Sequence, residues 1–169
     1  MKNQFIILML VFASSGAYTQ HDHSSHASHT KDQGTPAFED KNMGEAYGHY
    51  IHLKNALVAS NFGGAEKASS ELEKSLKIVT NGKKAAAGAN KIASSSDISE
   101  QRKYFSSLSD EMTVLVKATK LASGSLYVEY CPMANNNEGA YWLSNEKEIK
   151  NPYFGDMMLR CGTVKETLH

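Results

Sequence analysis

The feature that most constrains the fold is a helical repeat of apolar residues between Phe38 and Gly124. Apolar side chains recur every three or four residues, which places them along one face of an α-helix. Turn-forming residues at Gly63-Gly64 and Asn81-Gly82 divide the repeat into segments. The apolar stripes contain Met43, Tyr47, Tyr50, Ile51, Leu53, Leu57, then Ala65, Ala68, Leu72, Leu76, Val79, then Ala86, Ala89, Ile92, and finally Ile98, Phe105, Leu108, Met112, Leu115. Four amphipathic helices with short connections predict an up-and-down bundle.

The start of the fourth helix has its own signal. Asp97 is followed three residues later by Glu100, which is typical of a capping box.

After Gly124 the apolar period changes from three or four residues to two, and residues 126–131 are predicted to form a strand. The turn-rich "ANNNEGA" and the following "YWLS" indicate a β-hairpin whose returning strand covers residues 141–144.

A short helix is predicted after the hairpin. Asn151-Pro152 resembles a helix start with proline at the first helical position, and Gly162 would end the helix. Met157, Met158 and Cys161 would lie on it. The predicted fold is therefore mainly α: a bundle of about four helices with a small C-terminal β-hairpin and a short helix, over residues 37–169.

The N-terminus predicts export. One lysine, an apolar run over residues 5–13 and small residues up to Ala17 follow the order of a secretory signal peptide. The apolar run is shorter than the ~20 residues that a membrane-spanning helix needs. We interpret residues 1–17 as a signal peptide and expect a bacterial periplasmic location. No later segment is apolar enough to predict a membrane span after cleavage.

Residues 18–36 are polar and histidine-rich, and are predicted to be disordered because they lack an apolar period. Imidazole groups suit Cu(II) and Zn(II), so this tail is an accessory metal-binding candidate. Its histidines are His21, His23, His26 and His29.

Charge and motif content exclude some functions and favour others. The chain carries 18 basic and 18 acidic residues, a balance that argues against nucleic acid as a partner. The sequence has no CxxC, no phosphate-binding Gly-Lys-Ser/Thr, no GxSxG and no HExxH. We therefore expect a protein that is not an enzyme.

The two cysteines allow two interpretations. In an oxidising compartment, Cys131 and Cys161 would form a structural disulfide. Alternatively, each cysteine lies close to a methionine: Met133 follows Cys131 across one proline, and Met158 precedes Cys161 by three residues. Thiolate and thioether sulfurs are soft ligands that select Cu(I) and, by extension, Ag(I). The same four sulfurs would then form a metal site, with Met157 as a weaker candidate.

The chain resembles a known family over about Phe38 to Leu168, including the helical segment "YGHYIHLKNALVASN", and the specific signature lies in the C-terminal third. The segment "YCPMANNNEGAYWLSNEKEIKNPYFGDMMLRCG" is similar to the signature of domain of unknown function 3347. That family is periplasmic in Gram-negative bacteria and occurs alone or fused to membrane-fusion adaptors of copper and silver efflux systems. The matching motifs are Cys131-Pro132-Met133, Trp142-Leu143-Ser144, Asn151-Pro152-Tyr153 with Gly155, and Met158 with Cys161-Gly162. The resemblance implies a helical domain linked to heavy-metal handling.

These observations lead to one preferred function and one alternative. We expect a periplasmic Cu(I) or Ag(I) protein that carries or buffers metal for an efflux or resistance system, with an efflux adaptor as a possible partner. His49 and His52, three residues apart on the first helix, are additional ligand candidates. The alternative is a helical interaction module that docks to an efflux adaptor or another envelope protein. In it, a Cys131–Cys161 disulfide staples the hairpin and no metal binds.

Overall fold

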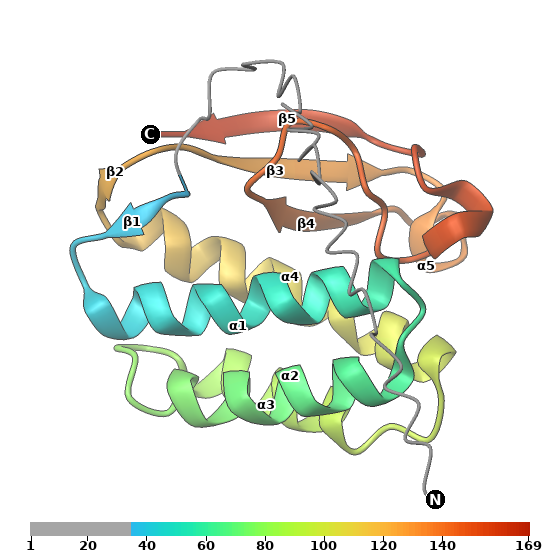
Figure 1. Cartoon of the computed structure of the whole chain (residues 1–169), viewed down its shortest axis with the longest axis horizontal. Coiled ribbons are helices and arrows are strands. Elements are labelled where there is room, and N and C mark those ends of the chain that lie inside the picture. The colour runs from blue at the N-terminus through green and yellow to red at the C-terminus, as the bar shows by residue number, and fades with distance from the viewer. Residues whose placement is uncertain (1–34) are drawn as a thin grey trace, which may run out of the picture. The chain divides into compact units, whose positions relative to one another are not determined.

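The structure is a computed structural model that describes residues 35–169, with four long helices below a small antiparallel sheet (Figure 1). The predicted signal peptide over residues 1–17, nearly all of the predicted disordered segment over residues 18–36, and the four tail histidines lie outside the described residues. The predictions made for those residues stay predictions.

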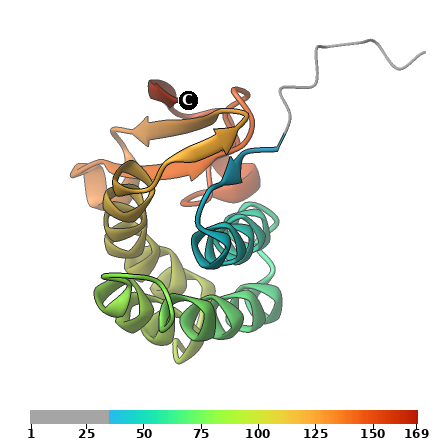
Figure 2. The same cartoon turned by 90° about the vertical axis from the view of Figure 1, so that its left-hand side faces the viewer.

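The four predicted helices are present and form the predicted bundle. Their bounds are α1 (Lys41–Val58), α2 (Phe62–Leu76), α3 (Lys83–Ala93) and α4 (Ile98–Ala118). Each helix runs antiparallel to the one before it and packs against it, so that α1 and α4 lie on the sheet side and α2 and α3 lie beneath them (Figures 1 and 2). Most of the predicted apolar stripe is buried. None of the helices within residues 35–169 has the length and apolar character needed to cross a membrane.

Helices α1, α2 and α4 begin at side-chain caps, which occupy backbone N–H groups that have no partner within the helix. Asp40 accepts from the N–H of Asn42 at 2.9 Å, before α1. At the start of α4, Asp97 accepts from the N–H of Glu100 at 2.9 Å, as predicted. The Glu100 carboxylate reaches back to the N–H of Ser96, at 2.8 Å, one residue before the position that a regular capping box uses.

The predicted hairpin is also present, and it belongs to a larger sheet than the sequence indicated. Strands β3 (Leu126–Cys131) and β4 (Ala140–Ser144) pair antiparallel, and β5 (Thr163–Leu168) pairs antiparallel with the other edge of β3. A separate pair joins β1 (Ala37–Phe38) to β2 (Leu121–Ser123). Strands β1, β2 and β5 were not predicted. The main sheet lies across the side of the bundle formed by α1 and α4 (Figure 2).

The predicted helix after Asn151-Pro152 is largely wrong. Only a 3₁₀ turn, η1 (Gly155–Met158), forms there, and Cys161 lies beyond it. Gly155 has a positive φ of 56°, which interrupts any right-handed helix starting at Asn151. A side chain at Gly155 would also meet the Ser60 hydroxyl and the Arg102 guanidinium at under 3 Å.

One tyrosine joins the two layers. The Tyr50 hydroxyl, on α1, accepts from the Leu143 N–H of β4 at 3.0 Å and shares a hydrogen bond with the Ser109 hydroxyl of α4 at 2.8 Å. All three residues are fully or almost fully buried. The hydroxyl therefore links both sheet-side helices to the sheet at a point that water does not reach.

Candidate functional site

The structure brings the two cysteines together. Cys131 ends β3 and is fully buried, whereas Cys161 follows η1 and is half-buried. Their Sγ atoms are 2.9 Å apart and both thiols are free. The hydrogen bond with Cys131, together with burial, raises the pKa of the Cys161 thiol to about 11. The pair is placed either to close a disulfide with little movement or to present two sulfurs to one soft ion.

Asn151 holds Cys161 in this position. It is fully buried, and its side-chain N–H donates to the carbonyl oxygen of Cys161 at 2.7 Å. Its side-chain oxygen accepts from the Tyr153 N–H at 2.8 Å, and its backbone bonds Leu159 and Gly155. The segment from 151 to 161 is thereby held by the side chain and the backbone of one residue. In the sequence, Asn151 was interpreted as a helix start and as part of the family motif, and neither observation reveals these contacts.

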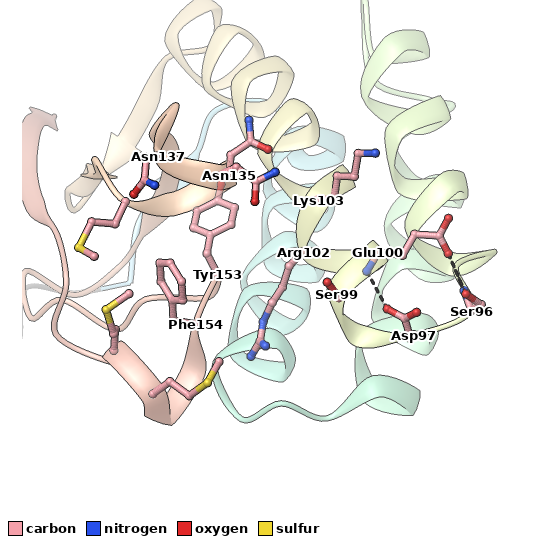
Figure 3. Close-up of a pocket in the computed structure, with 14 residues that line it drawn as sticks. Ser96, Asp97, Ser99, Glu100, Arg102, Lys103, Asn135, Asn137, Tyr153 and Phe154 are labelled. Atoms are coloured by element: carbon pink, nitrogen blue, oxygen red, sulfur yellow. Dashed lines mark hydrogen bonds between the residues drawn. The ribbon is translucent and has the colours of Figure 1, made fainter.

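The methionines near the cysteines lie around a cavity of about 930 Å³. Met133, Met157 and Met158 all line it, and neither cysteine does. Figure 3 shows the three sulfur-bearing side chains on the side of Phe154 and Asn137, with Asp97 and Glu100 on the opposite side. The cysteines and the cavity methionines thus come from the same two segments, 131–137 and 153–161, but the cavity has a third wall over residues 96–103 and does not include the cysteines.

The segment between β3 and β4 has an unusual backbone. It is labelled α5 (Ala134–Asn137) in Figure 1, yet Asn135, Asn136 and Asn137 have φ values of 50°, 57° and 69°. Three successive left-handed residues are costly for L-amino acids, although asparagine tolerates this region better than most. The Asn135 side chain donates to the Glu138 carboxylate at 2.8 Å. Such backbone strain concentrates at functional sites, and here it lines the cavity beside Met133.

Arg102, on α4, closes the other side of the cavity and was not identified from the sequence. Its guanidinium donates to the carbonyl oxygen of Pro152 at 2.9 Å and to that of Leu57 at 3.0 Å. It also donates to the Ser60 hydroxyl at 2.9 Å. Partial burial lowers its pKa. The arginine therefore clamps the end of α1 to the segment that carries Met157 and Met158.

The two candidate ligand histidines of the helical domain, His49 and His52, both lie on α1. The rings of His49 and His52 are 6.2 Å apart, and His49 lies 3.9 Å from the Glu45 carboxylate. The pKa of Glu71 on α2 is lowered by the hydrogen bond and the charge of Lys74. Within residues 35–169, no group of three or more histidine, cysteine, aspartate or glutamate side chains is arranged to hold a metal. Neither histidine therefore joins the cysteine pair in such a group.

A buried carboxyl group lies beside the cysteine segment and was missed by the sequence analysis. Glu129 on β3 is fully buried, and neither of its carboxylate oxygens has a hydrogen-bond partner among the described residues. Burial raises its pKa to about 8, against opposing effects of Lys54 and of the Trp142 indole. The indole N–H acts on the carboxylate without the geometry of a hydrogen bond. In the sequence, Glu129 is one polar residue in an alternating strand and gives no signal of burial.

Comparison with known proteins covers the helices and not the cysteine segments. No curated protein and no solved structure matches the chain. A family model described as "Protein of unknown function (DUF3347)" matches residues 46–124, and over this helical region the chain is similar to that uncharacterised domain family. The matched region ends at Gly124, so that both cysteines and the cavity methionines lie beyond it.

Proposed function

We propose that this protein binds Cu(I) or Ag(I) and carries or buffers the ion, in the periplasm, for an efflux or resistance system. The observation that supports the proposal best is the 2.9 Å separation of the Cys131 and Cys161 sulfurs. Two thiolates on adjoining segments suit a soft monovalent ion that tolerates low coordination numbers, and they disfavour hard cations such as Mg²⁺ and Ca²⁺. Met133 and Met158, which follow and precede these cysteines in the sequence, line the neighbouring cavity and are proposed as further sulfur donors to the same ion, weaker than the thiols.

The proposal requires the reduced protein, because a disulfide removes both thiolates. We expect the reduced chain to take one Cu(I) tightly from a coloured competing chelator, and the oxidised chain to compete far less well. Met133→Leu with Met158→Leu should weaken binding in the reduced chain, whereas the buried Met112→Leu serves as the matched control. Equal competition by both redox forms, or none by either, would contradict the proposal.

The same sulfur separation supports the alternative function, an interaction module stapled by a Cys131–Cys161 disulfide. That module would dock to an efflux adaptor or another envelope protein and would not bind metal at the cysteines. Mass analysis of the protein isolated from the periplasm under thiol-trapping conditions separates the two proposals. Two trapped thiols are expected for the metal protein, and a protected disulfide in all molecules favours the module.

A further inference from the structure

The cavity methionines differ from the core methionines in their exposure. Met43 and Met112 are fully buried in the bundle, where a flexible thioether fills gaps in the packing. Met133 is 46% exposed and Met157 is 77% exposed, although both are apolar. Core packing therefore explains the first pair and does not explain the second. The exposed methionines and Met158 lie around one cavity instead of being scattered over the surface.

The segments that carry these side chains are fixed in place. Met133 lies two residues before the first left-handed asparagine, and Gly139 closes that turn against the Tyr130 ring, where a Cβ would be 2.0 Å from the hydroxyl. Met157 and Met158 lie on η1, whose first N–H, at Gly155, donates to the Asn151 carbonyl oxygen, and the Arg102 guanidinium donates to the carbonyl oxygen of Pro152 just before η1. A ligand site needs this kind of support, because donors on mobile loops are not held in a productive geometry.

The charged groups around the cavity do not supply a site for a hard cation. Asp97 and Glu100 line it together with Arg102 and Lys103, so that two acidic groups are matched by two basic ones. No cluster of three carboxylate, imidazole or thiol groups is present in the part of the chain that the structure describes. The remaining donors are the methionine thioethers, which are neutral and soft. They select Cu(I) or Ag(I) by the softness of the sulfur and not by its charge.

We propose that Met133, Met157 and Met158 form a thioether site for Cu(I) or Ag(I) that works without the cysteine pair. This inference rests on the proposed function, to which it adds a second site at which the ion is held before or after it reaches the thiols. Thioethers have no proton to lose and do not form the disulfide. The site is therefore expected to bind in either redox state of Cys131 and Cys161, more weakly than the thiols do.

The test uses the full chain with Cys131→Ser and Cys161→Ser, labelled with ¹³C at the methionine methyl groups. Addition of Cu(I) should shift the methyl signals of Met133, Met157 and Met158, while those of the buried Met43 and Met112 serve as internal references. On the same background, changing the three cavity methionines to leucine should lower Cu(I) affinity by at least about tenfold. Removal of a direct ligand costs no less than removal of an outer-sphere partner, which typically costs ~10- to 100-fold.

The outcomes separate this inference from the proposed function. Shifts confined to the three cavity methionines, lost in the leucine variants, support the thioether site. If the serine variant binds no Cu(I) while the reduced natural chain does, the thioether site is overturned and the proposed function stands. If the natural reduced chain binds no more Cu(I) than the serine variant, and the methyl shifts persist, the thioether site stands and the cysteine site fails. If an apolar peptide shifts the methyl signals of the cavity methionines and Cu(I) does not, the inference is overturned.

Discussion

The helical bundle and the C-terminal sheet layer bury their interiors in different ways. In the bundle, most inward positions are apolar, although Lys54 and Gln101 are also buried, and α1, α2 and α4 begin at asparagine or aspartate caps. The sheet layer contains a buried glutamate, two adjacent thiols and three left-handed asparagines. The buried glutamate and the left-handed asparagines cost stability, and such costs persist in proteins mainly where a site needs them. This contrast favours the sheet layer over the bundle as the location of the proposed site.

Glu129 shows this contrast most clearly. It pairs across the hairpin with Trp142, and its charge acts on Tyr47, Tyr50 and Lys54 of α1. Burial is the largest cause of its raised pKa, and the nearby Lys54 offsets only part of that effect. With a pKa of about 8, the side chain is mostly a neutral acid at pH 7. The sheet layer therefore contains a group that loses its proton in the physiological range.

The largest predicted effect follows from this carboxyl group. The folded state keeps the proton that the unfolded state releases near pH 4.5, so that stability is complete below that pH and decreases as the pH rises through about 8. At about 1.4 kcal/mol per pKa unit, the rise from 4.5 to about 8 gives a loss of at most about 5 kcal/mol. Urea unfolding of the natural chain and of Glu129→Gln, from pH 5 to pH 9, measures it. The glutamine variant should show a much flatter profile.

The interpretation of that measurement has to account for Lys54 and needs a control variant. Lys54 is buried and its pKa is lowered, so its contribution to stability rises with pH and opposes the effect of Glu129. Because Glu129 itself raises the pKa of Lys54, the difference between the natural chain and Glu129→Gln removes the contribution of Lys54 only in part. The exposed Glu66→Gln is the matched control and should follow the natural profile. Equal profiles for the natural chain and Glu129→Gln between pH 5 and pH 9 would show that Glu129 is ionised in the fold.

The second prediction concerns the junction between the two layers. Tyr50→Phe removes the hydroxyl that joins Ser109 and the Leu143 N–H, and leaves both polar groups buried without that partner. Such unsatisfied groups cost about 1–3 kcal/mol, so the free energy of unfolding should fall by about 2 kcal/mol. Tyr141→Phe, at a ring that is 41% exposed, should change it by less than about 0.5 kcal/mol.

Amide hydrogen exchange shows in which elements Tyr50→Phe lowers the stability. If the sheet layer depends on the bundle through Tyr50, then Tyr50→Phe should speed exchange in β3 and β4 more than in α2 and α3. Uniform acceleration in all of these elements would mean that the two layers unfold as one unit, and the comparison between them would describe composition alone.

The sequence predicted the bundle well because helical periodicity is local. The stripe on α1 and the cap at Asp97 depend on residues within a few positions of each other, and both were confirmed. Strand β5 was missed because it is an edge strand whose residues are mostly exposed, so it lacks an apolar alternation. The helix predicted after Asn151 failed because the left-handed Gly155 was not visible in the pattern.

The candidate site was predictable only in part, for a related reason. The approach of Cys131 to Cys161 was expected from their shared compartment and number, and the structure places their sulfurs together. The roles of Glu129, Arg102 and Asn151 depend on which residues pack against them from distant parts of the chain. The spacing of residues in the sequence does not predict such long-range contacts. The separation of the methionine cavity from the thiols likewise follows from the folded arrangement and not from the Cys-Pro-Met motif.

The smallest predicted effect tests the strained turn between β3 and β4. Asn136 is exposed, has φ 57° and ψ 39°, and its side chain forms no hydrogen bond within the described residues. Asn136→Ala places a less tolerant residue in the left-handed region and should lower the free energy of unfolding by about 1 kcal/mol. Asn136→Gly should leave it unchanged or slightly raised, since glycine adopts this conformation without the steric cost. Thermal unfolding of both variants measures the difference. Equal losses in the two variants would mean that the Asn136 side chain, and not its backbone, stabilises the turn, and the strain assigned to the sheet layer would then be smaller than its φ values indicate.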